Sequence, residues 1–282
     1  MAKRKRSLTE NKIERLIKEG RGQGIGEEYK PWILVQDVPS LGRATRLKGI
    51  KTNRQHEFLS DMERDYFYIL EYSNNVVDIR EQFPLLPLEE TILIAKELGI
   101  KHPTDPKTNE PIVMTTDFLV TINKNGKYID VARTIKPQDE LMNKRTLDKF
   151  EIERRYWEKQ EFDWGIVTEN EIDKVLAQNI LYMYPYNDLY ELDSFIEIEK
   201  EDVDDLVITY LDRIIGETVD IRKVSKLFDQ DFNLKSGTGL SIFYYVVIRK
   251  IIRINLLEEL DLSKVKDIHI EEENLKKEMK II

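Results

Sequence analysis

The stretch TTDFLVTINKNGKYIDVARTIKP, residues 115–137, decides the fold of this chain because it has the pattern of a two-stranded hairpin. Apolar residues flank the dipeptide Asn125-Gly126, which favours a tight hairpin turn. The first strand carries Asp117 near its start, and the second strand ends at Lys136. With a turn at 123–126, we expect these two side chains to come close to facing one another across the ladder.

The segments on either side of the hairpin predict a layered α/β domain. The expected elements, in chain order, are a helix near 8–19, a helix at 60–72, a strand at 76–88 that ends at Pro84, the hairpin, a helix at 138–160 and a strand at 163–169. Residues 89–114 contain Pro103, Pro106 and Pro111, so we expect them to be irregular. This mixed order predicts a small sheet flanked by helices.

Length and composition predict a second domain. The chain has 282 residues, and single cores stop growing beyond roughly 250 residues. We expect a catalytic domain at 1–168 and a mainly helical domain at 169–282. In the second domain, a helix at 219–230, a glycine turn and a longer helix through about Ile254 have the outline of a helix-turn-helix or winged helix. That outline fits nucleic-acid contact and equally a structural or partner-binding role.

Charge is distributed unevenly along the chain. The formal net charge is −9, yet residues 1–54 hold 14 Lys and Arg against 6 Asp and Glu, a net of +8. Residues 169–282 hold 15 against 25, a net of −10, but within them residues 219–257 hold 7 against 3, a net of +4. Local fields attract a polyanion whatever the total charge, so two basic islands are compatible with DNA binding. The cations predicted to contact DNA are Lys3, Arg4, Lys5, Arg6, Arg21, Lys235, Arg249 and Lys250.

The loop KEGRGQGIG, residues 18–26, places a glycine at every second position and does not have the spacing of a nucleotide-binding loop. We expect mobile backbone between basic side chains there, either touching phosphates or serving as a plain flexible loop.

Composition limits the kinds of metal site. The absence of cysteine excludes disulfides and thiolate ligands and fits a reducing compartment. The three histidines are scattered, so a catalytic metal would bind oxygen ligands, which favours Mg²⁺ or Mn²⁺. No stretch approaches the ~20 apolar residues that cross a bilayer, and the N-terminus lacks the apolar core of a signal peptide. We expect a cytoplasmic, nucleoid-associated protein without a membrane partner.

Two acids and one lysine form a candidate site for phosphodiester cleavage. That reaction needs a metal at the scissile phosphate, a deprotonated water and a stabilised leaving oxyanion. Glu63 and Asp117 offer oxygen ligands for one or two Mg²⁺ ions, and the backbone carbonyl of Ile135 offers another. Lys136 can orient the attacking water and neutralise phosphate charge.

Each of these residues also has an ordinary structural explanation. Ser60 and Glu63 have the spacing of a helix capping box. Asp117 and Lys136 can form a simple cross-strand ion pair. Glu153, in the charged run EIERR, can belong to a solvated helix face.

An acid on a first helix, an Asp on a strand and a lysine ending the next strand resemble the PD-(D/E)xK restriction-endonuclease superfamily. The segments IKEGRGQG, PWILVQDVPS, DIREQFPLLP, GIKHP, TTDFLV, IKP and RTLDKFEIERRYW are similar to the TnsA endonuclease subunit of heteromeric cut-and-paste transposons. The resemblance spans most of residues 12–168. Beyond residue 168 only a general helical, winged-helix-like character is shared.

The resemblance implies a restriction-endonuclease-like fold and a Mg²⁺-dependent endonuclease. Such a subunit hydrolyses DNA at the 5′ ends of the transposon, while a TnsB-like DDE transposase cuts and joins the 3′ ends. Glu63, Asp117 and Lys136 then form the catalytic set, and Glu153 is a further member. The C-terminal part is expected to contact DNA, the TnsB-like transposase or a TnsC-like AAA+ ATPase regulator.

Thr134 departs from the superfamily pattern, which calls for Asp or Glu two residues before the lysine and usually has Gln in TnsA-type proteins. A threonine hydroxyl can still bind a metal or its water, but it is shorter than Gln, so a second metal site is in question. Two alternatives follow. One is a metal-independent DNA-binding adaptor with a decayed nuclease fold, and the other is a repair or junction-resolving nuclease of the same superfamily.

Overall fold

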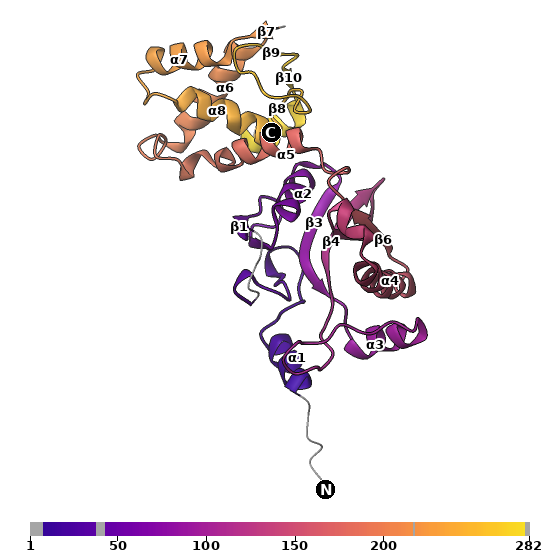
Figure 1. Ribbon diagram of the computed structural model, residues 1–282. Coiled ribbons are helices and arrows are strands. Elements are labelled where there is room, and N and C mark those ends of the chain that lie inside the picture. The colour runs from indigo at the N-terminus through magenta and orange to yellow at the C-terminus, as the bar shows by residue number, and fades with distance from the viewer. Residues whose placement is uncertain (1–7, 38–42, 217, 280–282) are drawn as a thin grey trace. The chain divides into compact units, whose positions relative to one another are not determined.

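The computed structural model describes residues 8–37, 43–216 and 218–279. The chain forms two compact units, Met1–Ile172 (unit 1) and Asp173–Ile282 (unit 2), shown in Figure 1. The boundary lies four residues after the expected one at residue 168 (172 − 168). The basic run Lys3, Arg4, Lys5 and Arg6 lies outside the described residues. None of the helices in the described part is both long and apolar enough to cross a membrane.

Unit 1 is built on a four-stranded mixed sheet with the strand order β3-β4-β5-β6. Its strands are β3 (Val76–Pro84), β4 (Thr115–Lys124), β5 (Lys127–Ile135) and β6 (Asp163–Val167). The first three run antiparallel to their neighbours, whereas β6 is parallel to β5. This sheet matches the architecture expected for a restriction-endonuclease-like fold.

The expected hairpin is present, but its register differs from the expected one. Asn125 and Gly126 both have positive φ, as a two-residue hairpin turn of this type requires. Phe118 pairs with Arg133, so extending the register by one residue sets Asp117 opposite position 134. The prediction that Asp117 comes close to facing Lys136 is therefore wrong by two residues. A hairpin of fixed turn length allows only one register.

Helices cover both faces of the sheet (Figure 1). The first face is covered by α3 (Leu88–Glu97) and α4 (Lys144–Lys159), and the second by α2 (Asp61–Tyr72) with the hairpin β1 (Thr45–Lys48) and β2 (Gln55–Phe58). On the α4 face, Ile152 and Trp157 pack against Leu119 and other buried residues of the sheet. On the α2 face, the ring of Phe58 lies 4.7 Å from that of Phe67 and 6.0 Å from that of Phe118.

One expectation about secondary structure is wrong, and one element was not expected. Helix α3 occupies part of the region expected to be irregular, because the prolines of that region all lie beyond Glu97 and leave the run 88–97 free to form a helix. The hairpin β1–β2 was not predicted. The expected helix at 138–160 is present in two parts, a 3₁₀ turn at Gln138–Met142 and then α4.

The glycine-spaced segment is docked on β3, so the expectation of mobile backbone is wrong. After α1 (Leu8–Lys18), residues 20–32 form what we call the strap. Its hydrogen bonds to β3 are Tyr29 Oη to the Glu81 carbonyl (3.0 Å), Trp32 N to the Gln82 carbonyl (3.2 Å) and Gly26 N to Asp78 Oδ1 (3.2 Å). Gly22 has φ +70°, and a Cβ there would overlap the ring of Pro84. Only glycine allows this close approach.

Unit 2 is mainly helical. Its helices are α5 (Lys174–Met183), α6 (Lys200–Ile214), α7 (Ile221–Asp231), α8 (Thr238–Ile248) and α9 (Glu272–Met279), and its two-residue strands are β7 (Thr218–Val219), β8 (Ile252–Arg253), β9 (Val265–Lys266) and β10 (His269–Ile270). The carboxylate of Asp229 accepts hydrogen bonds from the amides of Gly237 and Gly239, both at 2.7 Å, and so fixes the turn between α7 and α8.

Helix α8 is the buried centre of unit 2. Most of its residues are buried, among them Ile242, Phe243 and Val247, and the helix ends at Ile248, short of the expected Ile254. A recognition helix must present an exposed polar face to a DNA groove. The structure therefore does not support the winged-helix expectation in which this second helix reads DNA.

Candidate active site

Glu63 and Asp117 meet at the side chain of Gln82. Glu63 lies in the first turn of α2, Asp117 near the start of β4 and Gln82 near the end of β3. The Nε2 group of Gln82 donates to Glu63 Oε2 at 3.4 Å and to Asp117 Oδ1 at 3.3 Å. The structure thus brings two acids from distant parts of the chain around one amide group.

The start of α2 fixes the Glu63 carboxylate. Ser60 caps the helix by accepting a hydrogen bond from the amide of Glu63 at 3.2 Å, and its hydroxyl donates to Glu63 Oε1 at 2.9 Å. The amide of Leu59 donates to Glu63 Oε2 at 3.0 Å. The capping role expected for Glu63 is therefore present, and the same carboxylate also reaches the candidate site.

Asp117 reaches the α2 face because β4 is irregular at this point. The hydroxyl of Thr116 donates to Glu153 on α4, whereas Phe118 packs against Phe58 on the opposite face. In a regular strand, residues 116 and 118 would lie on the same face. The break between them turns Asp117 toward Glu63.

Strand β3 is irregular at the same level of the sheet. Glu81 lies on the α2 face, where it binds Arg54, whereas the ring of Phe83 lies 5.8 Å from that of Trp157 on the α4 face. Between them, Gln82 has φ +48°, a left-handed conformation that is uncommon for a residue other than glycine. Such residues cluster at functional sites, where the surrounding contacts maintain them.

The end of β5 completes the group. The amide of Ile135 donates to Asp117 Oδ2 at 2.7 Å, so this peptide lies directly at the carboxylate. Lys136 follows, and its ammonium lies 2.7 Å from Glu140 Oε2. The lysine side chain keeps 31% of its surface exposed and Glu140 keeps 50%, so their ion pair is open to solvent. An exposed pair of this kind contributes at most about 1 kcal/mol and exchanges readily.

Burial, reinforced by nearby negative charge, makes the two acids weak. Burial raises the pKa of Glu63 to about 7, and the charge of Asp117 acts in the same direction. Burial likewise raises the pKa of Asp117 to about 7; the Ile135 amide opposes this rise, the charge of Glu153 adds to it and the charge of Lys136 opposes it. Carboxylates held this close are stabilised by a shared proton or by a cation.

The donor set fits Mg²⁺ or Mn²⁺. Mg²⁺ commonly binds one or two carboxylates together with substrate phosphates, and keeps several waters. Glu63 and Asp117 would supply the two carboxylates; the amide of Ile135 donates to Asp117, and the Ile135 carbonyl stays the further ligand expected from the sequence. Within residues 8–37, 43–216 and 218–279, no group of three or more His, Asp and Glu side chains is placed to hold a metal ion. A cation bound here would therefore depend on water and phosphate for its remaining ligands.

Glu153 and Thr134 belong to a different cluster. Glu153 Oε1 accepts hydrogen bonds from Thr116 at 2.6 Å, from Thr134 and from the indole of Trp164 at 3.1 Å. Burial raises the pKa of Glu153, which is only 2% exposed and so does not lie on a solvated helix face. The hydroxyl of Thr134 points to Glu153 and not to the Glu63–Asp117 pair, so the structure gives no support to its expected role as a metal ligand.

The cations predicted to bind DNA make contacts within the chain. Arg21 pairs with Asp37 and Glu19, Lys235 donates to the carbonyl of Asp193 at 3.1 Å, and Arg249 binds both oxygens of Glu278 at 2.7 Å. Lys250 also has an interaction partner. DNA contact by these four residues stays a prediction.

Gln82 and the buried charges next to it were not among the residues predicted from the sequence. Glu81 is fully buried, accepts two hydrogen bonds from Arg54 at 2.9 and 2.6 Å, and lies 2.8 Å from Nδ1 of His56. Burial alone would raise the pKa of Glu81, but the charges and hydrogen bonds of His56 and Arg54 lower it to about 2. The available signal was the polar run REQ inside an otherwise largely apolar strand.

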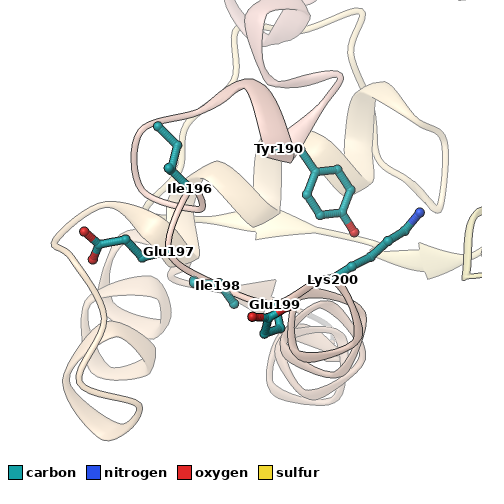
Figure 2. Close-up of a pocket in the computed structure, with 6 residues that line it drawn as sticks. All are labelled: Tyr190, Ile196, Glu197, Ile198, Glu199 and Lys200. Carbon is teal, nitrogen blue, oxygen red and sulfur yellow. The ribbon is translucent and has the colours of Figure 1, made fainter.

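A pocket in unit 2 has no such chemistry. Its volume is about 510 Å³, and it is lined by Tyr190, Ile196, Glu197, Ile198, Glu199 and Lys200 (Figure 2). The ammonium of Lys200 lies 5.6 Å from the centre of the Tyr190 ring, and Figure 2 shows Glu197 pointing away from both. Two glutamates and two isoleucines do not suit a phosphate backbone, so this pocket is not the candidate nuclease site.

Comparisons with known proteins agree with the geometry of unit 1. A family model described as "TnsA-like endonuclease N terminal" matches residues 73–169, which include Asp117 and Lys136. A second, described as "TnsA endonuclease C terminal", matches residues 171–256. The transposon Tn7 transposition protein TnsA of Escherichia coli is 39% identical over 275 residues, which cover 96% of this chain and 95% of that protein.

Proposed function

Since this chain belongs to the TnsA endonuclease family and is thus an endonuclease subunit of a transposase, we propose that it hydrolyses DNA at the 5′ ends of its transposon with Mg²⁺ or Mn²⁺. The resemblance noted in the sequence is confirmed by these matches. The observation that most supports the proposed chemistry is the meeting of Glu63 and Asp117 at one hydrogen-bond donor.

In this proposal the chain supplies the metal ligands and, in Lys136, an ammonium group that can change partners. Glu63 and Asp117 hold the metal ion, with the carbonyl of Ile135 as a further oxygen. When bound, the ion polarises the scissile phosphate and makes its water a stronger nucleophile. Lys136 exchanges its exposed partner Glu140 for a DNA phosphate and then orients the attacking water.

Partners complete the reaction. A TnsB-like DDE transposase would cut and join the 3′ ends, so that the two subunits together release the transposon by a double-strand break. Unit 2 is proposed to contact DNA, this transposase or a TnsC-like AAA+ ATPase regulator. The proposed location is the cytoplasm, at the nucleoid.

Strand-specific cleavage of transposon-end DNA tests the proposal. With the partner transposase present, Glu63→Ala and Asp117→Ala should abolish 5′-end cleavage and leave 3′-end cleavage in place. Glu140→Gln serves as the control and should retain 5′-end cleavage, since it removes only the exposed partner of Lys136. Full 5′-end cleavage by either alanine variant would refute the assignment.

One observation favours a second candidate, a DNA-binding adaptor with a decayed nuclease fold. Thr134, which stands where the family usually has a longer amide, points to Glu153 and away from the acid pair. Salt-sensitive, metal-independent DNA binding without nicking in Mg²⁺ or Mn²⁺ would support the adaptor. Cleavage of branched DNA without a partner would instead support a repair or junction-resolving nuclease.

A further inference from the structure

We propose that Gln82 is a positioning residue of the metal site: its amide group stands between the metal-free Glu63 and Asp117 carboxylates and withdraws when a divalent cation binds them. The inference rests on the proposed function in one respect, namely that these two carboxylates hold the cation.

The amide nitrogen lies where a shared cation would bind. Gln82 Nε2 is 3.4 Å from Glu63 Oε2 and 3.3 Å from Asp117 Oδ1. An NH₂ group has two protons, one for each acceptor. Two carboxylate oxygens that share one Mg²⁺ each lie about 2.0–2.1 Å from it. The amide and the cation therefore compete for the same two oxygens.

The donor end of the amide, and not its carbonyl, faces the acids. The hydroxyl of Thr115 donates to Gln82 Oε1 at 3.1 Å, which fixes the orientation of the amide. Gln82 is 2% exposed, so its two polar atoms depend on protein partners. The carbonyl oxygen is thus already bonded away from the carboxylates and does not serve as a metal ligand in this arrangement.

The backbone aims the side chain at the acids. Regular alternation would turn residue 82 to the face opposite residue 81. The left-handed φ of +48° at Gln82 breaks this alternation, and the strap stabilises it through the bond from Trp32 N to the Gln82 carbonyl at 3.2 Å. The uncommon backbone conformation of Gln82 thus places its amide donor between the carboxylates of Glu63 and Asp117.

Gln82 then lowers the affinity for the cation by stabilising the metal-free pair. Gln82→Met keeps the length of the side chain and removes both donors. We expect the variant to bind Mn²⁺ about tenfold more tightly, because two long hydrogen bonds to charged acceptors no longer have to be broken.

The test is a titration of the full chain with Mn²⁺ alone, at pH 8 and without DNA, in which the electron paramagnetic resonance signal reports free ion. Gln230→Met, an exposed glutamine in α7 of unit 2, is the matched control and should leave the affinity unchanged. Weaker or unchanged binding by Gln82→Met would overturn the inference. If that variant does not fold, Gln82→Asn replaces it, because Asn tolerates a left-handed backbone and is too short to reach both acids.

Asp117→Asn separates the two levels of the argument. If it abolishes Mn²⁺ binding while Gln82→Met binds no more tightly than the natural chain, the metal site stands and the role of Gln82 fails. If Asp117→Asn binds Mn²⁺ as well as the natural chain does, the proposed metal site itself fails, and the inference fails with it.

Discussion

Replacing Asp117 by Asn should abolish cleavage. It should also change how the stability of unit 1 depends on pH, so that the variant gains stability relative to the natural chain as the pH rises. The main cause is the burial of the Asp117 carboxylate, to which the negative charge of Glu153 adds. Burial raises the pKa of Asp117 from its ordinary 3.8 to about 7. A raised carboxyl pKa means that the folded chain retains a proton that the unfolded chain has lost. Stability is therefore complete below about pH 4, falls as the pH rises and reaches its lower level above about pH 7.

The size of the effect follows from that change in pKa. One pKa unit corresponds to about 1.4 kcal/mol, so the full change costs the folded state about 4 kcal/mol at pH 8 and about 1.6 kcal/mol at pH 5. The difference between the two pH values is then about 3 kcal/mol. Because Asp117 keeps some contact with solvent, we expect about 2 kcal/mol in practice.

Asn also places an NH₂ group against a donor, either the Ile135 amide or the Gln82 amide. That mismatch costs about 1–3 kcal/mol at both pH values. The diagnostic quantity is therefore the change in the variant's relative stability between pH 5 and pH 8, and not its stability at either pH alone.

Urea unfolding in the presence of EDTA, followed by tryptophan fluorescence, measures this quantity. All three tryptophans, Trp32, Trp157 and Trp164, lie in unit 1, so the signal reports that unit alone. In a separate titration without EDTA, free Mg²⁺ at 100 times its dissociation constant should stabilise the natural chain by about 2.7 kcal/mol and leave the variant unchanged. A variant whose stability relative to the natural chain is the same at pH 5 and pH 8 would refute the electrostatic reasoning.

Three further predictions concern neighbouring residues. Lys136→Ala should reduce 5′-end cleavage at least about 100-fold, the usual scale for losing a positioned proton-transfer or charge-stabilising group, in a strand-cleavage assay where Glu140→Gln retains activity. Thr134→Val should lower the free energy of unfolding by about 1–3 kcal/mol, because the buried Glu153 carboxylate loses a donor. Urea titration measures this loss, with Thr134→Ser, which keeps the hydroxyl, as the control. Gly22→Ala should destabilise unit 1 by more than about 1 kcal/mol, because its left-handed φ and lack of space both oppose a Cβ; an unchanged urea midpoint would contradict the docked strap.

The local features of unit 1 could be predicted from the sequence. The turn at Asn125-Gly126 and the cap at Ser60 depend on residues a few positions apart, so their patterns are visible in the chain. The meeting of Glu63 and Asp117 was predicted from the order of residues and from the family resemblance. Neither periodicity nor propensity alone would have given it.

What escaped prediction depends on which face of the sheet a residue occupies. Strand alternation fails at both Gln82 and Asp117, and no periodicity in the sequence marks this failure. Thr134 bonds to Glu153 on the α4 face of the sheet, whereas the acid pair lies on the α2 face. The sequence does not show on which face each of these residues lies, so their partners could not be predicted. In unit 2, the helix, glycine turn and second helix were compatible with a DNA-reading motif and equally with a structural role, and the buried α8 favours the structural role.

Glu81 and Gln82 are consecutive residues that point to the same side of the sheet, where Glu81 binds the buried Arg54 and Gln82 binds the acid pair. Moving Glu81 away from Arg54 would leave an unpaired charge in the interior. A shift of this strand would therefore strongly destabilise the fold. The proposed nuclease centre is consequently carried on a strand whose position is fixed before any DNA arrives, and premature cutting there would endanger the host chromosome. Cleavage must then be controlled through the access of the cation or of DNA to this site. Mutations that remove this control are to be sought on surfaces that contact other subunits.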